Sequence, residues 1–262
     1  MARQRLDSLL AERGLFESRT KAAAAVLAGE VRIGAGGARA AKPGQLVTDD
    51  LELAVDERPA FVSRGGIKLA NALDAFGVDP ASRRCLDVGA STGGFTDCLL
   101  QRGAEAVIAL DVAYGELHWN LRQDPRVTVI ERQNAREVDG LPFEPDLVVV
   151  DVSFISLTKV LGPVLSEAAE RFDCLAMVKP QFEVGRERVG KGGVVRDPSD
   201  RRDALLAVGA FAREELGLSV RGYASSGLPG PAGNAESFCW IAEAGREGAV
   251  EDLEAAARRV EP

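Results

Sequence analysis

Hydrophobic residues follow two different patterns along the chain, and the change falls near residue 60. Before it, apolar positions recur at helical spacing in residues 5–12 and 18–28, with Gly14 between them and Ser18 as a plausible N-cap. Alternating runs at 29–33 and 51–55, a glycine turn at 34–37 and a further strand around 42–44 then predict a small β unit. We therefore expect a small α+β domain over residues 1–58 and a linker over residues 59–64.

From residue 65 the chain alternates between continuous apolar runs and helical stretches. A first helix should end near residue 76, and runs such as Leu147-Val-Val-Val are typical of strands covered on both faces. We expect strands at 84–88, 106–111, 127–131, 146–152, 175–178, 218–224 and 238–242, and later helices at 94–101, 156–171 and 199–215. Residues 225–236 form a loop too rich in Gly, Pro and Ser for a helix, so the last strand should be antiparallel.

This alternation predicts a doubly wound α/β domain with a seven-stranded sheet over residues 65–245. The remaining residues, 246–262, are charged and rich in alanine. We expect them to form a frayed helix outside the domain.

Charge separates the two parts of the chain further. The whole chain of 262 residues carries a net charge of −8, but residues 1–48 hold eight Lys or Arg against four Asp or Glu. The basic first part indicates one positive face, whereas the rest of the chain is strongly acidic. The alternative is that short charged helices merely solvate a small domain.

Cysteine and histidine usage argues against a zinc site, and no other metal site is expected. The four cysteines are widely spaced in apolar segments without a Cys-x-x-Cys pair, and His118 is the one histidine. The N-terminus lacks the apolar core of a signal peptide, and no apolar run approaches the length of a membrane span. We expect a cytoplasmic protein with reduced, buried thiols and no contact with a membrane.

A glycine turn follows the first strand of the predicted sheet, in the segment from Cys85 to Thr96. Its Gly-x-x-x-Gly-Gly spacing lacks both the dinucleotide fingerprint and the Gly-Lys pair of a phosphate loop. A nucleotide-like ligand without phosphates fits such a turn better, and S-adenosylmethionine is the common one. Glycine turns after strands are frequent, however, so this segment alone is a weak signal.

Polar residues at the ends of the next strands strengthen the interpretation, because ligands of open α/β sheets bind beyond the carboxyl ends of the strands. Asp111 is placed to accept hydrogen bonds from ribose hydroxyls, and Asn134 can pair with an adenine edge. The predicted cofactor-binding residues are Asp87, Gly89, Ala90, Ser91, Thr92, Gly93, Gly94, Phe95, Asp111 and Asn134.

Two further strand ends carry charges of opposite sign, Asp151 and Lys179. Burying either charge alone would be costly, so we expect them to pair. An ordinary structural ion pair is the alternative, but both residues lie where this fold keeps its reactive groups. Lys68 and Glu236 flank the sheet, and each alone would more often be a surface charge.

The first fifty residues resemble the alpha-L RNA-binding motif. The resemblance rests on Arg5-Leu-Asp, Gly14, Ser18-Arg19, Lys21-Ala22, Gly29, Val31 and Lys42-Pro43-Gly44. It implies RNA contacts by Arg3, Arg5, Arg19 and Lys21. One departure is the turn at 34–37, Gly-Ala-Gly-Gly, where the motif usually has Asn-Gly; the hairpin should persist with altered RNA contacts.

The four charges Lys68, Asp151, Lys179 and Glu236 together resemble the Lys-Asp-Lys-Glu tetrad of FtsJ-like 2′-O-ribose methyltransferases. With the RNA-binding motif in front, the whole chain resembles the TlyA family, historically labelled haemolysins. Supporting segments are Ser63-Arg64-Gly65-Gly66, Val150-Asp-Val-Ser-Phe-Ile-Ser156, Val178-Lys-Pro-Gln-Phe-Glu183, residues 189–198 and Gly233-Asn-Ala-Glu236. One departure lies in the linker, where Arg58-Pro-Ala-Phe-Val replaces the usual Arg-x-Trp-Val.

The resemblance implies a class I, Rossmann-like methyltransferase that uses S-adenosylmethionine to methylate a ribose 2′-hydroxyl, in a cytidine of ribosomal RNA. Lys179 would take or orient the hydroxyl proton, Asp151 would hold Lys179, and Glu236 with Lys68 would position the ribose and its phosphate. Arg64 is expected to contact RNA, and Lys68 could instead be only a phosphate contact. Ribosomal RNA or a subunit is the expected partner, with the protein a monomer or weak dimer.

Two other functions remain open from the sequence. The chain could be a ribosome-binding or assembly factor that keeps the fold without transferring a methyl group. It could also be a pore-forming haemolysin, although its apolar segments give this little physical basis.

Overall fold

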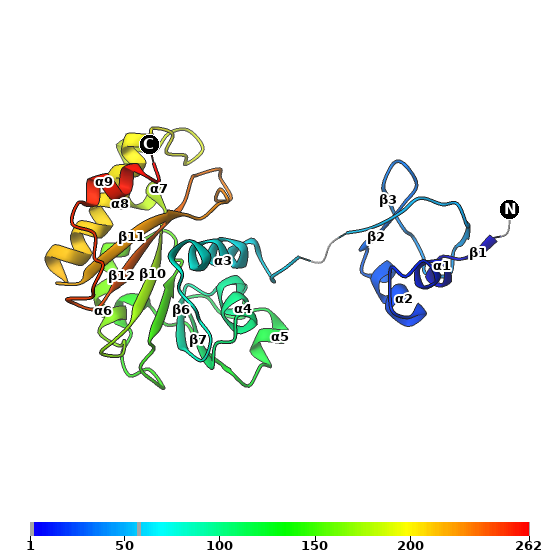
Figure 1. Ribbon diagram of the computed structural model, residues 1–262, viewed down its shortest axis with the longest axis horizontal. Coiled ribbons are helices and arrows are strands. Elements are labelled where there is room, and N and C mark those ends of the chain that lie inside the picture. The colour runs from blue at the N-terminus through cyan, green and yellow to red at the C-terminus, as the bar shows by residue number, and fades with distance from the viewer. Residues whose placement is uncertain (1–2, 57–58, 262) are drawn as a thin grey trace. The chain divides into compact units, whose positions relative to one another are not determined.

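The computed structural model describes residues 3–56 and 59–261 and divides the chain into two compact units, residues 1–59 and 60–262 (Figure 1). The expected domain boundary at residue 58 lies outside the described residues, as does Arg58 of the linker. Each unit is described by itself.

The first unit has two helices and two small sheets. Strand β1 (Arg3–Arg5) pairs with β4 (Leu46–Thr48), and β2 (Val31–Ile33) lies between β3 (Ala38–Arg39) and β5 (Leu53–Val55). Helices α1 (Leu6–Glu12) and α2 (Arg19–Leu27) bury Leu6, Leu10 and Val26 in one core, to which β2 adds Val31. The Ser18 hydroxyl accepts from the Lys21 backbone N–H at the start of α2, which confirms the expected N-cap.

The expected strand around residues 42–44 is wrong. These residues form a turn in which the Gln45 side chain accepts from the backbone N–H groups of Ala41 and Lys42. Pro43 has no N–H to donate to a ladder, and its carbonyl instead accepts from Asp7 at the start of α1. The hairpin at 34–37 is present, closed by a hydrogen bond from Gly37 N–H to the Gly34 carbonyl.

The second unit is built on a seven-stranded sheet, in the order β11-β12-β10-β9-β6-β7-β8. Strand β12 runs antiparallel to both of its neighbours, and the pairs among β10, β9, β6, β7 and β8 are parallel. The expected seven-stranded sheet with an antiparallel last strand is therefore confirmed. The strands are β6 (Arg84–Val88), β7 (Ala106–Asp111), β8 (Val127–Glu131), β9 (Leu147–Val150), β10 (Asp173–Val178), β11 (Ser219–Ser225) and β12 (Ser237–Ala242).

Helices cover both faces of this sheet (Figure 1). One apolar cluster joins the sheet to α3 (Arg64–Phe76), α4 (Gly94–Gln101) and α5 (Trp119–Arg122). The other cluster joins the opposite face to α6 (Leu161–Leu165), α8 (Pro198–Ala210) and α9 (Leu253–Arg258). Shorter elements are η1 (Ala135–Glu137), η2 (Leu157–Lys159), α7 (Pro180–Glu183), η3 (Arg186–Arg188) and the π-helical turn η4 (Phe211–Glu215).

The helix expected over residues 156–171 is wrong in its length. The segment contains η2 and the five-residue α6, and residues 166–171 form turns and bends. Pro163 is tolerated in the first turn of α6 but cannot donate to a helix that continues from residue 156. The helix expected over 199–215 is α8 followed by η4.

The tail is part of the unit, contrary to our expectation of a frayed helix. Helix α9 is capped by Asp252, whose side chain accepts from Ala255 N–H. The helix buries Leu253, Ala256 and Ala257 against α8 and β11. Alanine presents a small apolar face, so α9 can approach α8 closely despite its charged outer surface.

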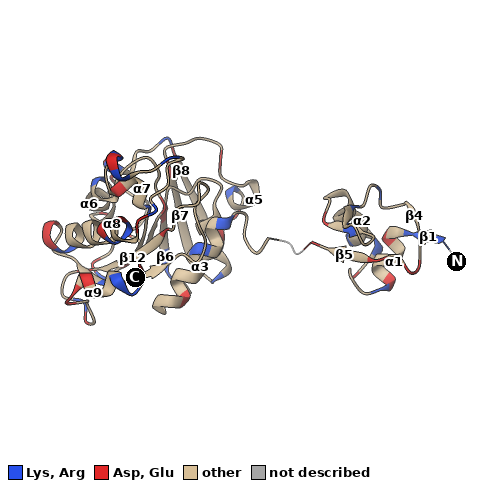
Figure 2. Cartoon of the chain, turned by 90° about the horizontal axis from the view of Figure 1, so that it is seen from above, with Lys and Arg blue, Asp and Glu red and all other residues tan. Residues whose placement is uncertain are grey.

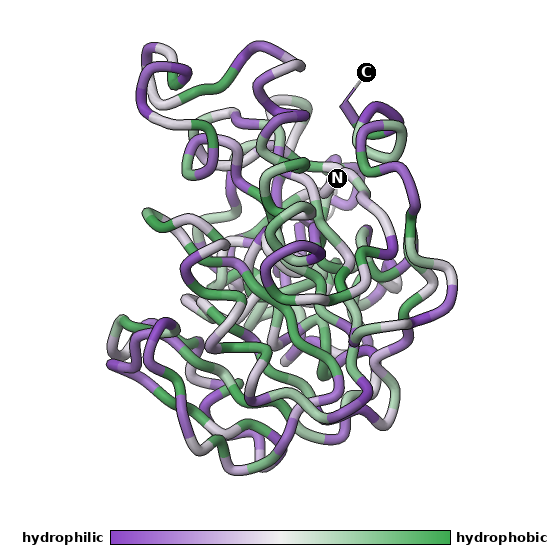
Figure 3. Tube along the Cα trace, turned by 90° about the vertical axis from the view of Figure 1, so that its left-hand side faces the viewer, coloured by the Kyte–Doolittle hydropathy of each residue, from purple (hydrophilic) through white to green (hydrophobic). Residues whose placement is uncertain are grey.

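Hydrophobic stretches are short and alternate with hydrophilic ones along the chain (Figure 3). Among the residues that the structure describes, no helix has both the length and the apolar character needed to cross a membrane.

Candidate active site

The glycine turn between β6 and α4 brings the backbone close to a neighbouring strand end. Gly89 has a φ of 84°, and a Cβ there would lie 2.7 Å from the Asp151 carbonyl oxygen. Gly93, with a φ of 95°, packs in the same way against Leu117 and Leu121. Both positions need a residue that tolerates a positive φ and has no side chain, and only glycine is such a residue. The turn therefore leaves the carboxyl end of β6 open.

Asp87 lies beneath this turn. Its side chain is fully buried, and Oδ2 accepts from both the backbone N–H (2.9 Å) and the hydroxyl (2.7 Å) of Thr96. Burial raises the pKa of this carboxyl to about 7. Asp87 lines neither of the pockets described below, so its position suits a residue that shapes the turn rather than one that touches a ligand.

The Asp111 pocket, a cavity of about 660 Å³, opens at the ends of β7, β8 and β9. Asp111 accepts from the backbone N–H groups of Ser91 and Ala113, both at 2.7 Å. The Asn134 amide oxygen accepts from Arg136 at the start of η1. Apolar walls complete the cavity, formed by Leu110, Val112, Ala135, Val152, Ile155 and Val160.

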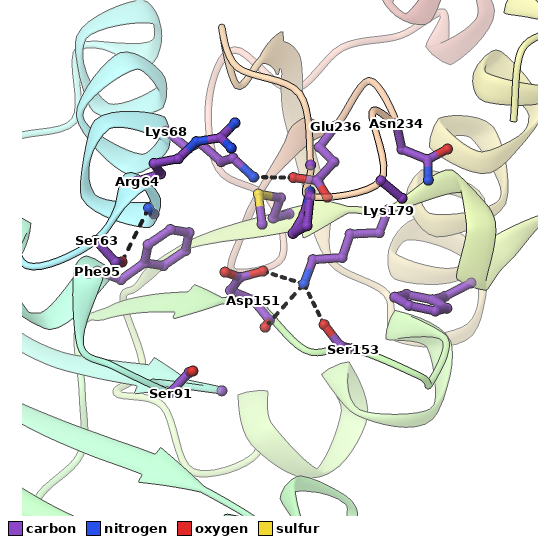
Figure 4. A pocket seen from close by; sticks show the side chains of 18 of the residues that line it. Ser63, Arg64, Lys68, Ser91, Phe95, Asp151, Ser153, Lys179, Asn234 and Glu236 are labelled. Atoms are coloured by element: carbon purple, nitrogen blue, oxygen red, sulfur yellow. Dashed lines mark hydrogen bonds and ion pairs between the residues drawn. The ribbon is translucent and has the colours of Figure 1, made fainter. Parts of the chain in front are cut away.

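The tetrad pocket, about 630 Å³, contains Lys68, Asp151, Lys179 and Glu236 (Figure 4). Lys179 Nζ lies 2.6 Å from Asp151 Oδ1 and donates to Ser153 Oγ at 2.8 Å. Lys68 pairs with Glu236, and both of these side chains are almost completely buried. The two pockets share Gly89, Ser91, Asp151, Ser153 and Phe154, so a single elongated ligand can occupy the Asp111 pocket and reach the tetrad.

The four charges occupy one low-dielectric space. Burial raises the pKa of the Asp151 carboxyl, an effect that Lys179 and Lys68 oppose and Glu236 reinforces. Two lysines and two carboxylates balance one another in charge. Removing one member would leave a buried charge without its partner, which typically costs about 3 to 5 kcal/mol.

Several other residues of the tetrad pocket were not predicted. Ser153 holds Lys179, and Phe154 is 92% exposed with a φ of 65°, its ring 5.4 Å from that of Phe182. Asn234 is buried on the loop that carries Glu236 (Figure 4). Ser153 and Phe154 both belong to the segment Val150-Asp-Val-Ser-Phe that carries the family resemblance, but nothing in that segment indicates which residues they contact.

The basic residues expected to contact RNA have acidic neighbours in the chain. Arg5 and Arg19 both pair with Asp7, at 2.7 and 3.3 Å, and Lys21 pairs with Glu17. Figure 2 shows basic residues of β1 beside acidic residues of α1. Arg3 is exposed on β1. In the second unit, Arg64 lines the tetrad pocket and donates to the Pro229 carbonyl at 2.7 Å.

The four cysteines are buried free thiols. Across residues 3–56 and 59–261, no group of three or more His, Cys, Asp or Glu side chains is arranged to hold a metal ion.

Comparison with known proteins identifies close relatives. The model of the FtsJ-like methyltransferase family matches residues 61–242. The 16S/23S rRNA (cytidine-2′-O)-methyltransferase TlyA of Mycobacterium tuberculosis is 51% identical over 243 residues, which cover 91% of this chain and 90% of TlyA. Hemolysin A of Brachyspira hyodysenteriae is 41% identical over 77% of this chain and 84% of its own.

A solved structure agrees with these matches. A hemolysin-named protein of Streptococcus thermophilus is 37% identical and similar in structure, with a TM-score of 0.72, over 99% of this chain and 96% of its own. Since the family match covers more than half of the chain and the relatives align along most of it, the chain belongs to the TlyA family of FtsJ-like methyltransferases.

Proposed function

We propose that this protein transfers a methyl group from S-adenosylmethionine to a ribose 2′-hydroxyl of ribosomal RNA. The observation that carries the proposal is the tetrad of Lys68, Asp151, Lys179 and Glu236, paired in one pocket that adjoins the Asp111 pocket. The named activity of the M. tuberculosis relative supports a cytidine as the target. Such a function places the protein in the cytoplasm, where ribosomes are.

The Asp111 pocket suits the adenosine part of S-adenosylmethionine. The Asp111 carboxylate can accept from ribose hydroxyls, the Asn134 amide in the pocket wall can pair with an adenine edge, and the apolar walls suit a flat ring. The backbone at residues 89–94 leads from this pocket to the tetrad pocket, where the methionine part would lie. When bound, S-adenosylmethionine supplies an activated methyl group on a positively charged sulfur.

The tetrad suits the acceptor side of the reaction. Lys179 is held by Asp151 and Ser153, so its Nζ occupies one defined place for a hydrogen bond with the 2′-hydroxyl. The hydroxyl proton must leave as the oxygen bonds to the methyl carbon, and the Lys179–Asp151 pair is the group placed to receive or orient it. The Lys68–Glu236 pair would fix the ribose, and alignment of the reacting atoms supplies much of the rate.

RNA can reach this pocket if the target nucleotide turns out of its helix. The exposed Phe154 ring, paired with Phe182 at the pocket rim, offers a surface on which an unstacked base can lie. Arg64 at the same pocket, and the basic residues Arg3, Arg5, Arg19 and Lys21 of the first unit, would contact phosphates.

Transfer of labelled methyl groups from S-adenosylmethionine to isolated ribosomal subunits tests the proposal, with the modified nucleotide mapped afterwards. We expect incorporation at a cytidine ribose by the wild-type protein. Lys179→Ala should lower kcat by about 10² to 10⁴, because the group that handles the hydroxyl proton is lost. Its affinity for S-adenosylmethionine, measured by calorimetry, should remain within a few fold, and Lys159→Ala, an exposed residue outside both pockets, should behave as wild type.

Full activity of Lys179→Ala would remove this residue from the mechanism. Tight binding of the wild-type protein to subunits without any transfer would instead support the alternative of a non-catalytic ribosome-binding factor.

A further inference from the structure

A glycine-rich turn at residues 190–196, here named the 190–196 turn, forms part of the wall of the tetrad pocket through Gly193. Gly190 N–H donates to the Val194 carbonyl at 3.1 Å, and Gly193 N–H donates to the Gly190 carbonyl at 3.0 Å. Gly192 and Gly193 have φ values of 81° and 76°, and a Cβ on either would meet no atom within 4 Å. These glycines are therefore needed for the backbone conformation of the turn and not for space.

The Asn234 side chain ties this turn to the loop that carries Glu236. Its Oδ1 accepts from Val195 N–H and its Nδ2 donates to the Gly193 carbonyl, both at 2.8 Å. Its own carbonyl accepts from Gly230 N–H at 2.8 Å. Asn234 is 1% exposed, and Glu236 follows two residues later. One buried amide thus holds two pocket walls that come from distant parts of the sequence.

The 190–196 turn presents a positive charge at its outer side. Lys191 is exposed, and its side chain has no acidic partner among the residues that the structure describes. Arg188, just before the turn, is by contrast paired with Asp200 and Asp203. Lys191 lies two residues from Gly193, so its Cα is within about 7 Å of that of a pocket-wall residue.

We propose that Lys191 contacts an RNA phosphate next to the target ribose, and that Asn234 is the positioning residue that holds this contact in register with Glu236. The proposal rests on the proposed function, since it concerns how the RNA acceptor is held. The Lys68–Glu236 pair would fix the ribose inside the pocket, and Lys191 would fix the adjoining backbone outside it. The rigid turn between them keeps the two contacts at a constant separation.

A double-mutant cycle on Asn234 and Lys191 tests this coupling in the full chain. We expect Lys191→Ala to reduce the salt slope of subunit binding by about 0.7 to 0.9, the loss of one phosphate contact. Asn234→Ala should remove the same contribution and also lower kcat, with affinity for S-adenosylmethionine unchanged. Adding Lys191→Ala to Asn234→Ala should then change the salt slope no further. Lys159→Ala, which changes an exposed lysine outside both pockets, should leave the slope unaltered.

A second variant covers the possibility that Asn234→Ala does not fold. Gly192→Ala keeps every buried side chain but strains the turn, because its φ of 81° disfavours alanine. Adding Lys191→Ala to Gly192→Ala should likewise change the salt slope of subunit binding no further.

Additive effects of the two substitutions, or an unchanged salt slope in Lys191→Ala, would overturn the inference. Methyl transfer by the wild-type protein is measured in the same preparations. Absence of transfer would overturn the proposed function, whereas transfer with an additive cycle would overturn the inference alone.

Discussion

At the scale of single residues, Asp87, beneath the glycine turn, makes the stability of the fold depend on pH. Its carboxyl is fully buried, Oδ2 is bound to Thr96, and Oδ1 has no hydrogen-bond partner among the described residues. Its pKa rises from 3.8 to about 7, so the folded protein holds a proton that the unfolded chain releases at lower pH. Stability from this group is therefore fully present below about pH 4 and is lost as the pH rises to about 7.

Replacing Asp87 with asparagine should remove this pH dependence. The asparagine Oδ1 can still accept from Thr96, and the variant cannot ionise. From about pH 5 to pH 8, we expect the free energy of unfolding of the wild type to fall by a few kcal/mol relative to Asp87→Asn. Urea unfolding at several pH values measures the difference. Asp139→Asn, a change at an exposed loop residue, should follow the wild type; parallel curves for all three proteins would refute the assignment.

At this scale the sequence indicates where charged residues lie better than it indicates their partners. Because Asp151 and Lys179 both follow strands of the sheet, the sequence predicts that they pair, and Lys179 Nζ lies 2.6 Å from Asp151 Oδ1 in the structure. The contacts of Ser153 and Asn234 were not predictable, although both lie in segments that carry the family resemblance, since a serine or asparagine in a loop has no periodic pattern and binds neighbours distant in sequence. The chemical roles of all these residues remain predictions for the experiments above.

At the scale of elements, the loop at residues 226–236 controls where Glu236 lies. A Cβ on Gly230 would come within 2.9 Å of the Glu236 Cδ and still closer to Oε1. The absence of a side chain at this position therefore lets the carboxylate rest against the loop while it pairs with Lys68.

Gly230→Ala should therefore displace the Glu236 carboxylate and lower kcat by about tenfold or more, because small misplacements in an active site are costly. Gly162→Ala, in α6, is the matched control. Its Cβ would meet only the Leu216 side chain, at 3.6 Å, and alanine is a better helix former than glycine. Steady-state kinetics with ribosomal subunits checks both variants. Equal kcat values would show that Glu236 tolerates the added methyl group.

Elements with a strong pattern were predictable, and those set by proline or by tertiary contacts were not. The bounds of β6, β7, β8 and α4 agree with the expected ranges, because apolar runs and glycines mark both ends. The helix over 156–171 failed at Pro163, and the strand around 42–44 failed at Pro43. The sequence predicts a frayed tail where the structure has α9, because the stability of this helix comes from packing against α8, which composition does not reveal.

At the scale of the whole molecule, charge is unevenly distributed between the two units. Arg5 and Arg19 share Asp7, whose pKa they hold down at about 2, so these two arginines are oriented by an acid rather than isolated. An oriented arginine loses less entropy when it meets a phosphate, whereas the shared carboxylate reduces the local positive potential. Arg3 makes no such pair among the described residues.

Combined substitution of Arg3 and Arg19 by glutamine should weaken binding to ribosomal subunits and reduce its salt slope by about 1.4 to 1.8, the equivalent of two phosphate contacts. Affinity for S-adenosylmethionine should not change. Binding titrations at several salt concentrations measure the slope. Arg258→Gln, on α9 and paired with Glu254, combined with Lys159→Gln removes two exposed positive charges from the second unit and serves as the charge-matched control. An unaltered slope in the double variant would place the main RNA contacts elsewhere in the chain.

The pairing of Lys68 with Glu236 also fixes an order of events during synthesis. The two residues are 168 positions apart, and Glu236 directly precedes β12, which lies between β10 and β11 in the interior of the sheet. A chain emerging from the ribosome can fold its first unit early, but the tetrad pocket has no complete wall until β12 has been made and inserted. Each newly made molecule is therefore expected to gain activity only after β12, at residues 237–242, has left the ribosome.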